Sequence, residues 1–90
     1  QLFNLKDIDL SNNQLIGEIP NDFKKLIEIE EVLLYNNQLH GGISKVFGQL
    51  IKLKRILLNN NQLIGNIPVE LTQISGLTEL RLNDNQLSGD

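Results

Sequence analysis

The sequence predicts a solenoid, in which short structural units stack along one axis and each unit packs only on its neighbours. The main observation is a repeat of 24 residues: SNNQLIG, YNNQLHG, NNNQLIG and NDNQLSG follow one another at that spacing. A period between about 20 and 50 residues is the signature of stacked repeats. The second observation is that apolar residues alternate just before each string, as in a strand with one buried face. We therefore expect one uncapped array over residues 1–90, with turns at 2–25, 26–49 and 50–73 and a partial turn at 74–90.

The first half of each turn is expected to form a short strand. Strands of successive turns would lie side by side, about 4.8 Å apart, in one parallel sheet. The alternating apolar pairs are Ile8 and Leu10, Val32 and Leu34, Ile56 and Leu58, and Leu80 and Leu82. Two further apolar columns open the turns, at Leu2, Leu26, Leu50 and Ile74 and at Leu5, Ile29, Leu53 and Leu77.

One asparagine in each turn stands among these apolar positions: Asn13, Asn37, Asn61 and Asn85. A buried amide left without partners costs about 1 to 3 kcal/mol, so these side chains are expected to bond main-chain groups of their own and neighbouring turns. We predict a structural ladder. The preceding asparagine, for example Asn60, is expected to be exposed, so that Asn60→Ala would cost less than about 0.5 kcal/mol.

The second half of each turn predicts a second, shorter strand followed by a single 3₁₀ turn. The alternation Leu15-x-Gly17-x-Ile19 indicates the strand, and Pro20 directly after it would end the pairing. The remaining residues are too few for an α-helix. The large apolar residues Phe23, Phe47 and Leu71 are expected to stack as an inner spine.

Together these columns spell LxxLxxLxLxxNxLxGxIPxxLxx, which closely resembles the plant-type leucine-rich repeat of receptor-like kinase ectodomains and polygalacturonase inhibitors. The resemblance covers the whole chain, with Ser44 standing where Pro20 and Pro68 stand in other turns. It implies an α/β repeat class fold: a right-handed coil with a concave parallel sheet, a short second sheet and 3₁₀ turns on the convex side, without long α-helices. It also implies an extracellular or cell-surface location. The absence of cysteine caps and glycosylation sequons leaves a cytoplasmic location open.

Composition excludes several function classes. A net charge of −3 and few aromatic residues argue against nucleic-acid binding, and no apolar run is long enough for membrane insertion. Cysteine is absent, and the single histidine, His40, has no partner placed by the repeat. Asp7, Asp9, Glu30 and Glu31 could bind a cation or perform acid–base chemistry, but we favour a solvated acidic strip. We therefore expect no enzyme activity, no cofactor and no metal.

The outward positions of the concave strands are the expected binding surface for a protein or peptide ligand, because they vary from turn to turn while the core columns do not. The candidate partner-binding residues are Asp9, Glu31, Leu33, Tyr35, Arg55, Leu57, Asn59, Arg81 and Asn83. Leu33 and Leu57 are expected to form an exposed apolar island with Tyr35 at its edge. The rim would be acidic toward turn one and basic at Lys54 and Arg55. Binding energy commonly concentrates in such a central cluster.

Two alternatives remain open. The exposed glutamines Gln14, Gln38, Gln62 and Gln86 could form a regular ladder about 4.8 Å apart, which would organise water as in ice-binding proteins built on this repeat. The chain could also be a structural spacer in a larger assembly. Under the favoured interpretation we expect a segment of a larger receptor-like or inhibitor-like protein, stacked against further repeats or caps of its own chain.

Overall fold

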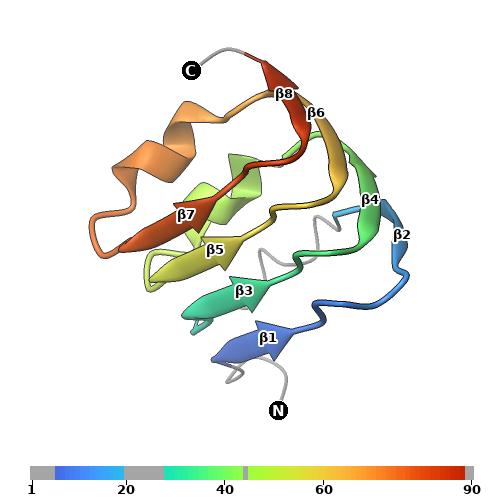
Figure 1. Ribbon diagram of the computed structural model, residues 1–90. Helices are drawn as coiled ribbons and strands as arrows, with labels where there is room; N and C mark the ends of the chain where they lie inside the picture. The colour runs from blue at the N-terminus through green and yellow to red at the C-terminus, as the bar shows by residue number, and fades with distance from the viewer. Residues whose placement is uncertain (1–5, 20–27, 44, 89–90) are drawn as a thin grey trace.

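The computed structural model describes residues 6–19, 28–43 and 45–88 of the 90-residue chain. Several positions that carried sequence expectations lie outside the described residues: Leu2, Leu5, Pro20, Phe23, Leu26 and Ser44. The strands of successive turns stack from β1 (Asp7–Asp9) and β2 (Ile16–Glu18) at one end to β7 (Glu79–Arg81) and β8 (Gln86–Ser88) at the other (Figure 1).

The first sheet contains one three-residue strand from each turn. The strands β1 (Asp7–Asp9), β3 (Glu31–Leu33), β5 (Arg55–Leu57) and β7 (Glu79–Arg81) are parallel and lie in that order. Their register is 24 residues per step, so that residues of one sequence column are direct neighbours across the sheet. This confirms the predicted parallel sheet.

The second sheet contains β2 (Ile16–Glu18), β4 (Gln38–Gly41), β6 (Gln62–Asn66) and β8 (Gln86–Ser88), again parallel and in that order. Its strands were expected to be shorter than those of the first sheet, and this was wrong: β4 has 4 residues and β6 has 5. The backbone leaves the αR and β regions at Gly17 (φ 96°) and Gly65 (φ 88°). Only glycine adopts such angles without strain, which explains the glycine column.

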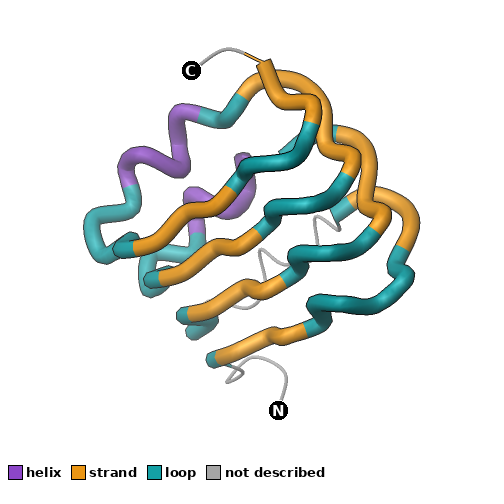
Figure 2. Tube along the Cα trace, viewed as in Figure 1, coloured by secondary structure: helices purple, strands orange, loops and turns teal. Residues whose placement is uncertain are grey.

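Two 3₁₀ helices, η3 (Lys45–Gln49) and η4 (Val69–Gln73), pack against each other behind the first sheet (Figure 2). Pro68 directly precedes η4, where its fixed φ of −62° suits the start of a helical turn. Phe47 and Leu71 are fully buried on these helices, which confirms the inner spine where the structure describes it. No helix in the described ranges has the length and apolar character needed to cross a bilayer.

The core lies between the two sheets and the 3₁₀ helices. The inward residues of the middle strands, Val32, Leu34, Ile56 and Leu58, are at most 3% exposed. In the first turn the equivalent Leu10 is 45% exposed, although it belongs to a core column. Among the described residues a turn packs on only one side of turn one, whereas the middle turns are covered on both sides.

The predicted asparagine ladder is confirmed by its hydrogen bonds. Asn61 Nδ2 donates to the carbonyl oxygens of Leu34 (3.0 Å), Leu58 (3.1 Å) and Asn59 (3.2 Å), and Asn61 Oδ1 accepts from the Leu39 N–H at 3.1 Å. Equivalent bonds to the preceding turn surround Asn37 and Asn85. In turn one, Asn13 donates to the Leu10 and Ser11 carbonyls of its own turn. The ladder therefore joins each turn to the one before it.

A second amide ladder, which the sequence did not reveal, lies one residue earlier. Asn60 Nδ2 donates to Asn36 Oδ1, and Asn36 Nδ2 donates to Asn12 Oδ1, both at 2.6 Å. These asparagines and Asp84 have φ values between 57° and 60°, the left-handed region that asparagine and aspartate tolerate better than most residues. Asn60 is exposed, as expected, but its backbone and amide are constrained. We therefore expect Asn60→Ala to cost more than the sequence alone suggested.

Candidate functional site

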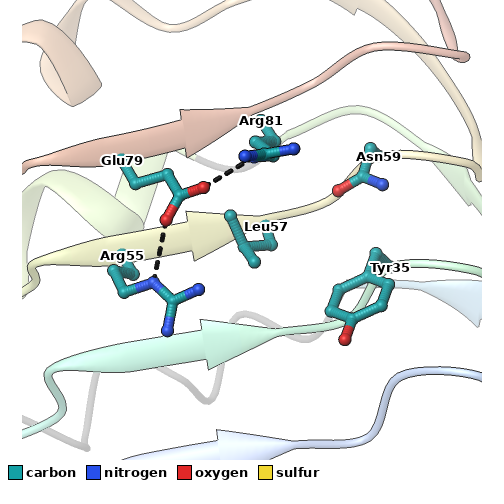
Figure 3. Close-up of a pocket in the computed structure, with 6 residues that line it drawn as sticks. All are labelled: Tyr35, Arg55, Leu57, Asn59, Glu79 and Arg81. Carbon is teal, nitrogen blue, oxygen red and sulfur yellow. Dashed lines mark hydrogen bonds and ion pairs between the residues drawn. The ribbon is translucent and has the colours of Figure 1, made fainter.

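The first-sheet face is the surface formed by side chains of β1, β3, β5 and β7, and of the two residues after each strand, that point away from the core. It contains a hollow with a volume of about 220 Å³, over the middle and last strands. Six residues line this hollow: Tyr35, Arg55, Leu57, Asn59, Glu79 and Arg81 (Figure 3). Five of them are among the nine predicted partner-binding residues, and Glu79 is added by the structure.

Leu57 forms the apolar part of the hollow, but it is not the exposed residue that the sequence led us to expect. It is 7% exposed, and Leu33 beside it in the sheet is half-buried. Leu57 nevertheless lies outside the main core cluster, and Figure 3 shows it between Arg55, Arg81, Asn59 and Tyr35. The exposed apolar island is therefore replaced by one leucine surrounded by polar and aromatic side chains.

Charged side chains around Leu57 are paired with one another. Arg55 Nε donates to Glu79 Oε1 at 3.0 Å, and Arg81 Nε donates to Glu79 Oε2 at 2.6 Å. Arg55 Nη1 also reaches Glu31 Oε2 at 3.5 Å. The expected basic rim at turn three was wrong, because Arg55 lies between two carboxylates and Lys54 pairs with Glu30 at 3.7 Å.

The pKa values of these groups follow from the pairing. Hydrogen bonds from Arg81 and Arg55 lower the pKa of Glu79 below its ordinary value of 4.5. The Glu79 carboxylate in turn raises the pKa of Arg55, with a smaller contribution from Glu31. Glu79 is therefore ionised at neutral pH and holds both guanidinium groups on the wall of the hollow. Arg81 is bonded only through Nε among the contacts within the described residues, which leaves the ends of its guanidinium group directed to solvent.

Asn59 is the least satisfied residue of the hollow. Its Oδ1 is buried and accepts no hydrogen bond from the described part of the chain. In Figure 3 this oxygen lies on the side of the amide that faces Leu57. A buried acceptor without a donor costs about 1 to 3 kcal/mol. The residue therefore weakens the fold where it lines the site.

The remaining predicted partner-binding residues do not line the hollow. Asp9, on β1, accepts hydrogen bonds from the hydroxyl and the main-chain N–H of Ser11, and these bonds lower its pKa. Glu31 does not line the hollow but pairs with Arg55, which does. Asn83 follows β7 and donates to Asp84 Oδ2 at 3.1 Å. Glu79 could have been found from the sequence, because it shares a column with Arg55 and stands two residues before Arg81.

The glutamines of the alternative site, Gln14, Gln38, Gln62 and Gln86, are all exposed, but they do not form the regular ladder that was expected. The register of the second sheet is 22 residues per step, so that Gln38 pairs with Ile16, Gln62 with His40 and Gln86 with Ile64. The reason is that each strand of this sheet is displaced by two residues from the strand before it. Neighbouring glutamines are therefore staggered along the strands.

The acidic side chains of turns one and two do not gather into a cluster. Within the described ranges no group of three or more histidine, cysteine, aspartate or glutamate side chains could hold a metal ion. Glu30 and Glu31 each pair with a cation of turn three, Lys54 and Arg55. His40 is exposed on β4, opposite Glu18 and Gln62.

Comparison with known proteins places the chain in a family. The family model "Leucine Rich Repeat" matches residues 4–26 and 52–74, which is just over half of the chain. The chain belongs to the leucine-rich repeat family. A comparison with curated proteins found no match.

Solved structures agree over nearly the whole chain. The plant peptide hormone receptor RGFR1 in complex with RGF2 is 44% identical with a TM-score of 0.95, over 99% of this chain and 14% of that one. The HAESA ectodomain of Arabidopsis thaliana, solved with an IDA peptide hormone ligand, is 39% identical with a TM-score of 0.92, over 97% and 15%. Pollen Receptor Kinase 3 is 43% identical with a TM-score of 0.92, over 99% and 43%. The chain thus spans less than half the length of each of these relatives.

Proposed function

We propose that this leucine-rich repeat segment is a recognition module that binds an extended peptide, or an extended segment of a protein, across the first-sheet face. The observation that carries the proposal is the hollow around Leu57, where an apolar floor, an aromatic side chain and two arginines meet. Binding energy concentrates in sites of this composition, with tyrosine and arginine among the enriched residues. Relatives that were solved as receptors with peptide hormones use the same fold.

The size of the hollow favours part of a long ligand over a small molecule. Pockets for drug-sized ligands occupy about 300 to 1,000 Å³, whereas this one has about 220 Å³. It can receive one side chain of a ligand that continues along the face. An extended peptide in the polyproline II conformation supplies such a ligand, because every third side chain points to one surface.

The proposal assigns no catalytic step and no cofactor to the chain. It also places the module outside the cell or at its surface, because relatives include the ectodomain of a plant membrane receptor kinase. These relatives give no support to the cytoplasmic alternative.

A selection from a random dodecapeptide display library tests the proposal. The full chain is the bait. Two variants, each with two alanine substitutions, show which surface binds the selected peptides. One carries Tyr35→Ala and Asn59→Ala on the first-sheet face, and the other carries Gln38→Ala and Gln62→Ala on the second sheet. We expect selected peptides to lose at least about tenfold in affinity for the first variant, which is about 1.4 kcal/mol, and to keep their affinity for the second. Loss on the second variant alone would move the site to the glutamine face and favour the ice-binding alternative. Failure to select any peptide would favour the structural spacer.

A further inference from the structure

We propose that the ligand presents one apolar side chain to the hollow and a basic side chain, three residues away, to the carboxylates of Asp7 and Asp9 in turn one. This inference rests on the proposed function and specifies the chemistry of the partner at that same face.

The apolar half of the inference follows from the composition of the hollow. Leu57 is its buried floor and Tyr35 forms part of its wall. The charged residues of the wall are already paired, since Glu79 holds both Arg55 and Arg81. A cationic ligand group would have to compete with both arginines for Glu79, whereas an apolar group extends the contact with Leu57 and leaves the pairs in place. Apolar area removed from water is worth about 25 cal/mol per Å².

The basic half follows from charges that the fold leaves without a counter-ion. Of the carboxylates on the first-sheet face, Glu31 and Glu79 form ion pairs with arginine. Asp7 and Asp9, both exposed on β1, form none with the cationic side chains in the described ranges. Their charge is open to a ligand, and complementary charge at the rim of a site sets orientation and association rate.

The spacing of three residues comes from the register of the first sheet. Asp9, Leu33 and Leu57 occupy one column, with Asp9 paired to Leu33 and Leu33 paired to Leu57. Two strand spacings of about 4.8 Å separate Asp9 from Leu57 by roughly 10 Å. A ligand in the extended polyproline II conformation advances about 3.1 Å per residue with three residues per turn, so its side chains three positions apart point to the same surface and lie about 9.3 Å apart. A ligand that runs across the strands therefore meets the carboxylates and the hollow with side chains three positions apart.

The test reads the sequences and affinities of peptides selected on the native chain. We expect lysine or arginine to be enriched three positions from an aliphatic or aromatic residue. The basic half is tested with Asp7→Asn and Asp9→Asn together, against Glu18→Gln and Glu70→Gln, which remove the same formal charge away from the first-sheet face. The affinity of a selected peptide should fall on the first pair of substitutions only. Replacing the peptide's basic residue by glutamine should then have little further effect, as a double-mutant cycle requires.

The apolar half is tested by filling the hollow. Leu57→Phe adds bulk toward open space, so folding should be retained, as circular dichroism can verify. We expect the Leu57→Phe variant to bind the selected peptides at least tenfold more weakly. In this variant, Asp7→Asn with Asp9→Asn should still reduce the affinity of peptides that carry the basic residue. Leu57→Ala should shift newly selected peptides toward larger apolar residues.

Three results would overturn the inference. The first is an equal loss of peptide affinity on both pairs of charge substitutions. The second is full affinity of the selected peptides for the Leu57→Phe variant. The third is that the selected peptides lack a basic residue three positions from an apolar one. If such peptides still depend on Tyr35 and Asn59, the proposed function stands and only the ligand chemistry is wrong. If they do not, both fail.

Discussion

Removing the amide of Asn61 should destabilise the array more than any exposed substitution nearby. The side chain is 8% exposed and makes 4 hydrogen bonds, one accepted from the Leu39 N–H and three donated to carbonyl oxygens. Each of those carbonyls keeps another donor in Asn61→Ala, namely Asn37 Nδ2 for Leu34, Asn85 Nδ2 for Leu58 and the Asn36 N–H for Asn59. The Leu39 N–H, on a buried residue, loses its acceptor.

The magnitude follows from this count. A buried donor left unpaired costs about 1 to 3 kcal/mol, and the lost donated bonds add about 0.5 to 1.5 kcal/mol in total because their acceptors remain satisfied. We therefore expect Asn61→Ala to lower the free energy of unfolding by about 2 to 4 kcal/mol. Gln62→Ala, at the next residue but exposed on β6, should cost less than about 0.5 kcal/mol.

Urea denaturation followed by circular dichroism measures both free energies of unfolding. Asn13→Ala is a further control, since Asn13 is exposed and, within the described ranges, its side chain bonds two carbonyls of its own turn. It should fall between the other two variants. Equal destabilisation by Asn61→Ala and Gln62→Ala would refute the assignment of the buried ladder.

Three further predictions concern the first-sheet face and its edge. Asn60→Ala should lower the free energy of unfolding by about 1 to 2 kcal/mol because φ at Asn60 is 60°, whereas Asn60→Gly should lower it less. Similar losses for both variants would show that the lost side-chain hydrogen bond, and not the backbone angle, dominates the cost. Asn59→Leu should raise the free energy of unfolding by about 1 kcal/mol, because it removes a buried unpaired acceptor. Asn83→Leu, in the same column but exposed, should not raise it. If Asn59→Leu brings no gain in stability, the amide of Asn59 is satisfied. The pKa of Glu79 is lowered, so its ion pairs stabilise the fold above the ordinary value of 4.5 and are lost as pH falls through the lower folded value. The free energy of unfolding of Glu79→Gln, measured against pH, should therefore fall less steeply in acid than that of Glu18→Gln. Parallel curves for the two variants would contradict this.

The sequence alone predicted the features that depend on repetition. Stacking 24-residue turns brings identical columns into register, so the buried leucines and the asparagine ladder could be placed without knowing any angle. The same columns predicted the first sheet and the 3₁₀ turns. These features follow from one period and from the cost of burying an unpaired amide.

Features that depend on neighbouring side chains could not be predicted in this way. The column pattern places Leu57 outside the core, yet it is buried by residues of other turns, and Arg55 is neutralised by Glu31 and Glu79. The second sheet is displaced by two residues per step, and a column alignment does not contain this displacement. The repeat thus predicts the position of each residue but not its contacts on the surface.

Nuclear magnetic resonance of the isotope-labelled chain with a selected peptide tests the central claim, that the first-sheet face is the recognition surface, most directly. We predict that titration shifts the main-chain signals of Tyr35, Leu57 and Arg81 and the side-chain amide of Asn59, and leaves the side-chain amides of Gln38, Gln62 and Gln86 in place. Shifts confined to the glutamine amides would contradict the account and assign recognition to the second sheet.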